Sequence, residues 1–327
     1  MRATGLAAPG AGRAPRVRLG DVDATEFEAL RPRLEAIAYR MTGSAADAQD
    51  LGQEAWLRWS AADRSDVEDP EAYLVRVVTR LAMDRLGSAA RRRESYVGPY
   101  LPEPVVAPLD SLEGSQPEDH AVLADSLTYS FLVLLDELGP VERAVLLLHD
   151  VFGYPFEEVA AAVGRSVPSV RQVASRTRRR IAAARPGWDP EAGPDAARRP
   201  AAEVADATMA GFLQAMVTGD VEGLLALLAP DVVTISDGGP LQRAARRPVV
   251  GPDRVARLLL WLNRRGVELG LGARLVAVNG RVGLLLALPD GAPYTVVTWE
   301  LDEAGRIVRV FLQLNPDKLR HLADADG

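Results

Sequence analysis

The 327-residue sequence contains no cysteine. This absence excludes a disulfide scaffold, thiolate metal sites and thiol catalysis. Long apolar runs are also missing, because runs such as residues 145–148 and 284–288 are far shorter than the about 20 residues that cross a membrane as a helix. Residues 1–20 lack the apolar segment of a signal peptide and are rich in alanine, glycine, proline and arginine, so we expect a disordered tail there. These absences predict a cytoplasmic protein with no membrane partner.

Lysine is almost absent, since Lys318 is the single lysine among 38 basic residues. The arginine bias is typical of a GC-rich genome, so the positions of the arginines are more informative than their number. A net charge of −7 would argue against nucleic-acid binding if the charges were evenly spread. They are clustered instead: residues 76–93 hold six arginines and one acid, residues 94–142 hold ten acids and no lysine or arginine, and residues 165–185 hold seven arginines and no acid. This alternation needs a physical explanation.

Apolar spacing and breaker residues divide the chain into parts. Helical periodicity covers residues 23–93, with a break at residues 43–44, and returns over residues 120–184. Proline-rich segments at residues 98–119 and 186–200 are typical of linkers. At roughly 150 residues per domain, the length allows two domains or three small ones.

The pattern changes after Glu203. Three helices are expected at residues 204–217, 221–228 and 253–263, and four period-two strands follow at residues 274–278, 282–288, 294–301 and 307–314. Hairpin turns connect these strands at Asn279-Gly280, Asp290-Gly291 and residues 303–305. Helices followed by an antiparallel meander predict an α+β domain.

Residues 156–185 have the pattern of a helix-turn-helix. A short amphipathic helix ends at Gly164, which permits a positive φ, and Ser166 and Pro168 suit the first turn of the next helix. In that second helix Val170, Val173 and Ala174 face inward, while the outward side chains are Ser169, Arg171, Gln172, Ser175 and Arg176. Arginine pairs with guanine and glutamine with adenine in a major groove, and Arg178, Arg179 and Arg180 would meet phosphates. The alternative is a solvated arginine-rich surface helix.

Two further segments narrow the interpretation. Residues 48–58, Ala-Gln-Asp-Leu-Gly-Gln-Glu-Ala-Trp-Leu-Arg, resemble the core-binding signature in region 2 of sigma factors. Residues 73–86 resemble the adjacent promoter-opening helix, and the acidic segment then leads to the helix-turn-helix of region 4. Over residues 23–185 this order resembles an extracytoplasmic-function (ECF) sigma factor. Gly52 stands where a β-branched residue is usual.

The remaining motifs resemble the SigJ-like subgroup of that family, in which a SnoaL-like domain is fused C-terminally. One motif is Tyr-Val-Gly-Pro-Tyr-Leu-Pro-Glu-Pro at residues 96–104, with Tyr100 where tryptophan is usual. The other is Ser-Asp-Gly-Gly-Pro-Leu at residues 236–241, where Pro240 and Leu241 replace a glycine and a lysine.

The resemblance implies a multidomain fold, with two all-α sigma domains followed by an α+β SnoaL-like cone. The expected divisions are a tail at 1–20, region 2 at 21–97, an acidic proline-rich linker at 98–119, region 4 at 120–185, a second linker at 186–202, and the SnoaL-like domain at 203–323. The implied function is to bind core RNA polymerase and direct promoter-specific initiation of transcription, modulated by the C-terminal domain. The acidic linker would mimic nucleic acid in a polymerase channel, and the alternative is a solubilising spacer.

The resemblance also assigns candidate site residues. Core polymerase would be bound by Asp50, Leu51, Gln53, Glu54 and Leu57. The −10 DNA would be contacted by Arg76, Thr79, Arg80, Arg85, Arg91 and Arg92, and the −35 DNA by Ser169, Arg171, Gln172, Ser175, Arg176 and Arg179. Regulatory contacts would be made by Tyr100, Leu101, Pro102, Glu103, Pro104, Asp237, Gly238 and Gly239. We expect no metal and no cofactor.

The C-terminal domain leaves one alternative function open, a SnoaL-type isomerase or cyclase fused to a DNA-binding module. Its acid–base candidates are few: His321 near the end, Asp231 at a strand start and Asp237 before two glycines. We expect no catalysis, and instead a domain that senses a small-molecule ligand or docks within the chain.

Overall fold

The computed structural model describes residues 19–63, 67–93, 96–112, 128–184, 200 and 202–322. Most of the predicted tail, the end of the first linker and nearly all of the second lie outside these residues. Within the described part of the chain, no helix is long and apolar enough to cross a membrane.

The part that resembles region 2 of sigma factors, called region 2 below, is a bundle of three helices, α1 (Leu19–Thr42), α2 (Ala45–Ala61) and α3 (Pro70–Arg93). Ser44 is the N-cap of helix α2, and its hydroxyl accepts a hydrogen bond from the Asp47 amide, which satisfies one amide of the first turn. Helix α3 begins at Pro70, where the Asp69 carboxylate accepts from the Ala72 amide at 3.0 Å. The predicted break at residues 43–44 is therefore the α1–α2 turn.

The part that resembles region 4, called region 4 below, contains α5 (Tyr129–Leu135), α6 (Pro140–Leu146), a π-helical turn over Leu147–Val151, α7 (Phe156–Val163) and α8 (Val167–Ala184). Gly164 adopts a φ of 68°, so the helix-turn-helix turn forms where the sequence predicts it. The buried residues of region 2 and region 4 form one continuous hydrophobic cluster, which joins Trp59 and Leu74 to Val145 and Val163. The sequence did not indicate this shared core.

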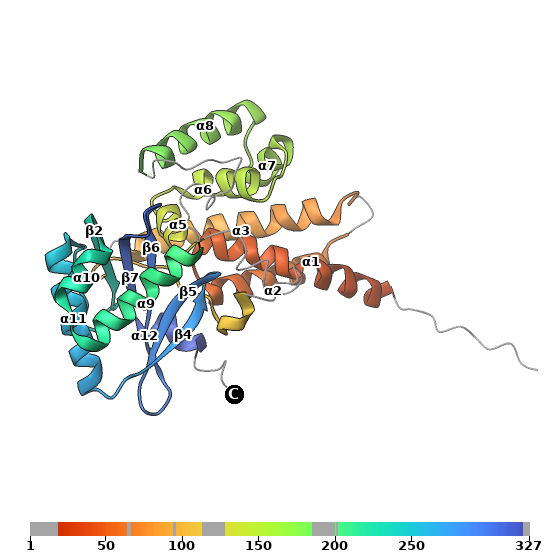
Figure 1. Ribbon diagram of the computed structural model, residues 1–327. Helices are drawn as coiled ribbons and strands as arrows, with labels where there is room; N and C mark the ends of the chain where they lie inside the picture. The colour runs from red at the N-terminus through yellow and green to blue at the C-terminus, as the bar shows by residue number, and fades with distance from the viewer. Residues whose placement is uncertain are drawn as a thin grey trace, which may run out of the picture.

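The C-terminal part is the expected α+β domain (Figure 1). Its helices are α9 (Ala202–Thr218), α10 (Val221–Leu227) and α11 (Pro252–Glu268), and its four meander strands are β4 (Gly272–Val278), β5 (Arg281–Ala287), β6 (Pro293–Leu301) and β7 (Ile307–Gln313). Strand β2 (Leu228–Asp237) runs parallel to β7, and the short β3 (Val249–Val250) pairs with β2. The predicted α+β cone is confirmed, with each meander strand within two residues of its expected bounds.

The first linker adds an unexpected strand to this sheet. Strand β1 (Val106–Ala107) pairs antiparallel with β4, so Val106 lies opposite Val278, and a 3-10 turn follows at Leu109–Leu112. The sheet order is β1-β4-β5-β6-β7-β2-β3. The sequence did not predict β1, because a strand of two residues is too short to show a period-two pattern. Residues 106–107 of the linker are therefore part of the sheet of the C-terminal domain.

The two faces of the sheet have different covers. Helices α9, α10 and α11 pack on one face in a core that includes Phe212, Val310 and Leu312. The other face is covered by the linker, by α5 and by α12 (Pro316–Leu319), through Leu101, Tyr129 and Leu319. In Figure 1, α10 and α11 lie at the left of the sheet and α1–α3 at the right.

Candidate functional site

The recognition helix α8 presents the face that the sequence predicts. Arg171, Gln172, Ser175 and Arg176 are exposed, Ser169 is half-buried, and Val170 and Ala174 are buried. The predicted phosphate contacts differ from one another, because Arg178 is paired with the buried Asp150 and Arg180 with Glu142, whereas Arg179 is exposed. The Arg171 guanidinium lies 5.5 Å from the Phe156 ring centre and 3.6 Å from the Glu157 carboxylate, so it contacts α7.

The predicted polymerase-binding face of α2 needs one correction. Leu51 is only 1% exposed and packs in the core, so it is not a surface contact. Asp50, Gln53 and Leu57 are exposed and share one face with Glu54, because positions separated by three or four residues align on a helix. The surface therefore consists of Asp50, Gln53, Glu54 and Leu57, and Leu57 is 60% exposed.

Gly52 is explained by its neighbour on α1. A Cβ at this position would lie 3.1 Å from Cγ of Glu35, so the side chain of Glu35 occupies the space that a β-branched residue would need. Burial raises the pKa of Glu35, and the nearby Arg31 opposes that rise.

Most of the described α3 side chains that were predicted to contact −10 DNA are buried or bonded to other parts of the chain. Thr79 is completely buried, so its hydroxyl does not face solvent and is not a surface contact in this arrangement. Arg80 donates to the carbonyl oxygens of Ala161 (3.0 Å) and Ala162 (3.2 Å) near the end of α7. Arg85 forms an ion pair with Asp47 at 2.7 Å. The side chains of Arg91 and Arg92 lie outside the described residues.

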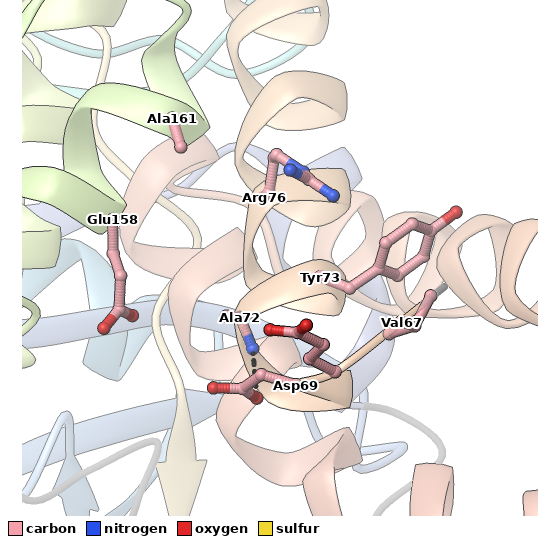
Figure 2. Close-up of a pocket in the computed structure, with 8 residues that line it drawn as sticks. Val67, Asp69, Ala72, Tyr73, Arg76, Glu158 and Ala161 are labelled. Carbon is pink, nitrogen blue, oxygen red and sulfur yellow. Dashed lines mark hydrogen bonds between the residues drawn. The ribbon is translucent and has the colours of Figure 1, made fainter. Parts of the chain in front are cut away.

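A pocket marks the junction between α3 and α7 (Figure 2). Arg76 lies on its α3 side, 5.4 Å from the Tyr73 ring centre, and Glu158 of α7 faces Asp69 across it. Burial and repulsion from Asp69 and Glu71 raise the pKa of Glu158. Region 4 thus closes on region 2 at the helix that is expected to open the promoter. We call this packing of α7 on α3 the closed arrangement.

Asp237 forms the centre of the predicted regulatory site. Its carboxylate accepts from the Tyr96 hydroxyl (2.6 Å), the Gly239 amide (2.9 Å), the Leu101 amide (2.9 Å) and the Lys318 ammonium (2.7 Å). Asp237 and Lys318 are almost fully buried, so this ion pair is shielded from water. The linker and the loop after β2 are therefore held together by one carboxylate.

Lys318 is a site residue that the sequence analysis missed. Its ammonium lies 3.1 Å from the centre of the Tyr100 ring and also bonds the Leu101 carbonyl. The lysine that the 236–241 loop lacks is thus matched by a lysine from α12, and an aromatic ring at position 100 provides its cation–π contact. The available signal was that Lys318 is the only lysine in an arginine-rich chain.

The two glycines after Asp237 are required by close approach. A Cβ on Gly238 would lie 2.4 Å from the carbonyl oxygen of Gln242, and one on Gly239, where φ is 57°, would lie 2.6 Å from Nδ2 of Asn315. Any larger residue would displace the loop from Asp237.

The remaining linker residues are held from both sides. Tyr129 donates from its hydroxyl to the Pro102 carbonyl at 2.6 Å, and Gln313 of β7 donates to the same oxygen at 3.0 Å. The Pro104 carbonyl lies 3.0 Å from Nε2 of His321. The linker is thus bonded to region 4 and to the C-terminal domain at once.

Glu103 connects the linker to region 2. Its carboxylate accepts from the Ser44 hydroxyl (2.9 Å) and the Ala45 amide (2.7 Å), where a negative charge is favourable at the start of α2. Its backbone carbonyl accepts from the Tyr39 hydroxyl, which in turn accepts from the Asn279 side chain of the β4–β5 turn. Burial raises the pKa of Tyr39 well above its usual value, so the hydroxyl stays a donor. Region 2, the linker and the sheet meet at this point.

Comparison with known proteins shows the family of this chain. The Sigma-70 region 2 family model matches residues 27–92, and the Sigma-70 region 4 model matches residues 129–181. The chain is 40% identical over 303 residues to the ECF RNA polymerase sigma factor SigJ of Mycobacterium tuberculosis, covering 91% of this chain and 93% of that protein. This chain belongs to the ECF sigma factors.

The similarity to SigJ includes the C-terminal domain. The crystal structure of M. tuberculosis SigJ matches this sigma factor with a TM-score of 0.70 and 34% identity, over 91% of this chain and 98% of that one. The probable ECF sigma factor SigI of the same organism is 31% identical and covers 90% of this chain. As a sigma factor, the protein binds core RNA polymerase and directs transcription initiation at promoter DNA.

Proposed function

We propose that this sigma factor regulates its own activity: its C-terminal domain binds the linker and thereby keeps the molecule in the closed arrangement. Opening on core polymerase, in the cytoplasm, would release the promoter-binding parts. The observation that carries this proposal is the pair of hydrogen bonds from Arg80 to the Ala161 and Ala162 carbonyls. In the closed arrangement Nε and Nη2 of Arg80 donate to α7, so the side chain has to leave α7 before these donors can bind the −10 DNA.

The binding surfaces follow from the exposed residues. Asp50, Gln53, Glu54 and Leu57 of α2 would contact polymerase, and Arg171, Gln172, Ser175, Arg176 and Arg179 of α8 would contact the −35 DNA. Arg76, Arg80, Arg85, Arg91 and Arg92 remain candidates for the −10 DNA after opening. Glu103 accepts hydrogen bonds at the start of α2, so movement of the linker would break these bonds at the helix that we propose binds polymerase.

A catalytic role for the C-terminal domain is disfavoured by the bonding of its acid–base candidates. Four donors already occupy the Asp237 carboxylate, so it has no free position for a substrate proton. His321 is directed at the linker carbonyl of Pro104, and Asp231 is exposed on β2. We propose that this domain acts by docking and not as an isomerase or cyclase.

A ligand would act where the linker can be displaced. A pocket of 380 Å³ lies between Gly98 of the linker and the loop after β2, with Arg243 and Arg246 in its lining. We propose this pocket as the place where a small molecule would compete with the linker, since its walls belong to both partners.

Locking the closed arrangement tests the proposal. The chain has no cysteine, so Ala72→Cys and Ala161→Cys, which line the α3–α7 pocket from opposite sides, can be joined by a cleavable bismaleimide. The cross-linked protein should lose promoter-dependent transcription with core polymerase and recover it when the bismaleimide cross-link is cleaved. The two single-cysteine variants, treated with the same reagent, are the controls. Full transcription by the joined protein would contradict the proposal.

A further inference from the structure

A third basic segment lies in the C-terminal domain, outside both sigma regions. Residues 241–265 contain seven arginines and a single acid, Asp253, in a protein whose net charge is −7. Neither the closed arrangement nor the linker site uses the arginines in the second half of this segment, which forms α11.

Helix α11 displays these arginines on one face. Its buried side, with Val255, Ala256, Leu259 and Leu260, packs on the sheet. Since a helix turns 100° per residue, the side chains that point the opposite way are those of Arg254, Arg257, Trp261, Arg264 and Arg265. All five are exposed, and their positions extend over roughly 16 Å of helix.

Two features distinguish this face from an ordinary solvated helix. Arg254 and Arg264 form no hydrogen bond or ion pair with the residues that the structure describes, and the only ion pair on the face is Arg265 with Glu268. Trp261, between the arginines, is 55% exposed, and a large aromatic side chain with charged neighbours is typical of a contact surface.

We propose that this face of α11 is a DNA-binding surface that contacts the phosphate backbone of duplex DNA. Duplex DNA carries one negative charge per about 1.7 Å of axis, so a stripe of this length can meet several phosphates. A guanidinium group can donate two parallel hydrogen bonds to the oxygens of one phosphate, and Trp261 would pack against the sugars between neighbouring phosphates. DNA is favoured over other anionic partners because the sigma regions attach promoter DNA to the same chain, which raises the effective concentration of DNA at this face.

The test measures sequence-independent DNA binding by the full-length chain. A labelled 40-base-pair duplex of mixed sequence is titrated with protein at several salt concentrations, and the affinity is followed by fluorescence anisotropy. The variant Arg254→Gln/Arg264→Gln should bind more weakly, and its slope of log K against log salt should be smaller by about 1.8, or ~0.9 per lost phosphate contact. Trp261→Ala should weaken binding without changing the slope.

A matched control removes the same charge elsewhere. Arg306 and Arg320 are exposed and already paired with Asp302 and Asp317, so Arg306→Gln/Arg320→Gln changes the net charge equally. This control should retain the wild-type slope. An equal loss of DNA affinity and of salt slope in both double variants would show that only the net charge matters, and would overturn the proposal. It would also be overturned if the α11 variant bound DNA normally but no longer co-eluted with core polymerase, because the partner would then be an acidic protein surface.

Discussion

At the residue scale, the account depends on Asp237 and Lys318. In the sequence, Asp237 before two glycines has the composition of a turn, and Lys318 belongs to a short terminal helix. No local pattern indicates that they form an ion pair, because they are 81 positions apart and are brought together with a linker that precedes both in the sequence. The motif around Asp237 could therefore be predicted as a contact with the linker, but its ionic partner could not.

Lys318→Met should destabilise the closed protein, because it leaves a buried carboxylate without its cation. Removing one partner of a buried pair costs about 3–5 kcal/mol, although three other donors to Asp237 will reduce that figure. Denaturant unfolding followed by tryptophan fluorescence measures the loss. The double variant Asp237→Asn/Lys318→Met should lose less than the sum of the single variants, and strict additivity would show that the two residues act independently.

The arginines of α8 should separate into two classes. Arg171→Ala or Arg176→Ala should cost about 1–3 kcal/mol at the preferred promoter and relax its sequence preference, because we propose that these exposed side chains contact base edges. Arg179→Ala should weaken binding to all sequences alike and lower the salt slope by ~1. Binding assays on matched and mutated −35 sequences check this, and equal, sequence-independent losses would refute the assignment of base contacts.

At the element scale, helix periodicity predicted most of the fold but not every surface. The strands of the meander were predictable because hairpin turns and alternation coincide, whereas β1 has only two residues. On α2 the sequence analysis assigned both Asp50 and Leu51 to the polymerase-binding surface, which was wrong for Leu51 because neighbouring positions on a helix differ by 100°. The structure assigns Leu51 to the core.

This difference on α2 can be measured. Glu54→Lys should abolish co-elution with core polymerase while the isolated protein stays folded, since like charges across an interface lower affinity. Leu51→Ala should instead lower the free energy of unfolding by about 2–5 kcal/mol, as for other buried leucines. Normal co-elution of the Glu54→Lys variant would exclude α2 as the docking helix.

At the scale of the whole molecule, the sequence predicted the order of the parts but not how they pack. The basic and acidic segments, the helix-turn-helix and the α+β domain were predictable from local patterns. The single core shared by region 2 and region 4, and the linker bonded to three parts of the chain, depend on contacts between distant residues. Such contacts leave no period in the sequence.

The most direct test of the central claim is the distance between region 2 and region 4 in the free and the polymerase-bound protein. Donor and acceptor dyes at Ala61→Cys in α2 and Ala183→Cys in α8, both exposed positions, report it by energy transfer. The account predicts one transfer efficiency for the free chain, a lower one when core polymerase binds, and a shift towards the lower value in Asp237→Asn/Lys318→Met without polymerase. An efficiency that stays the same in all three cases would contradict it.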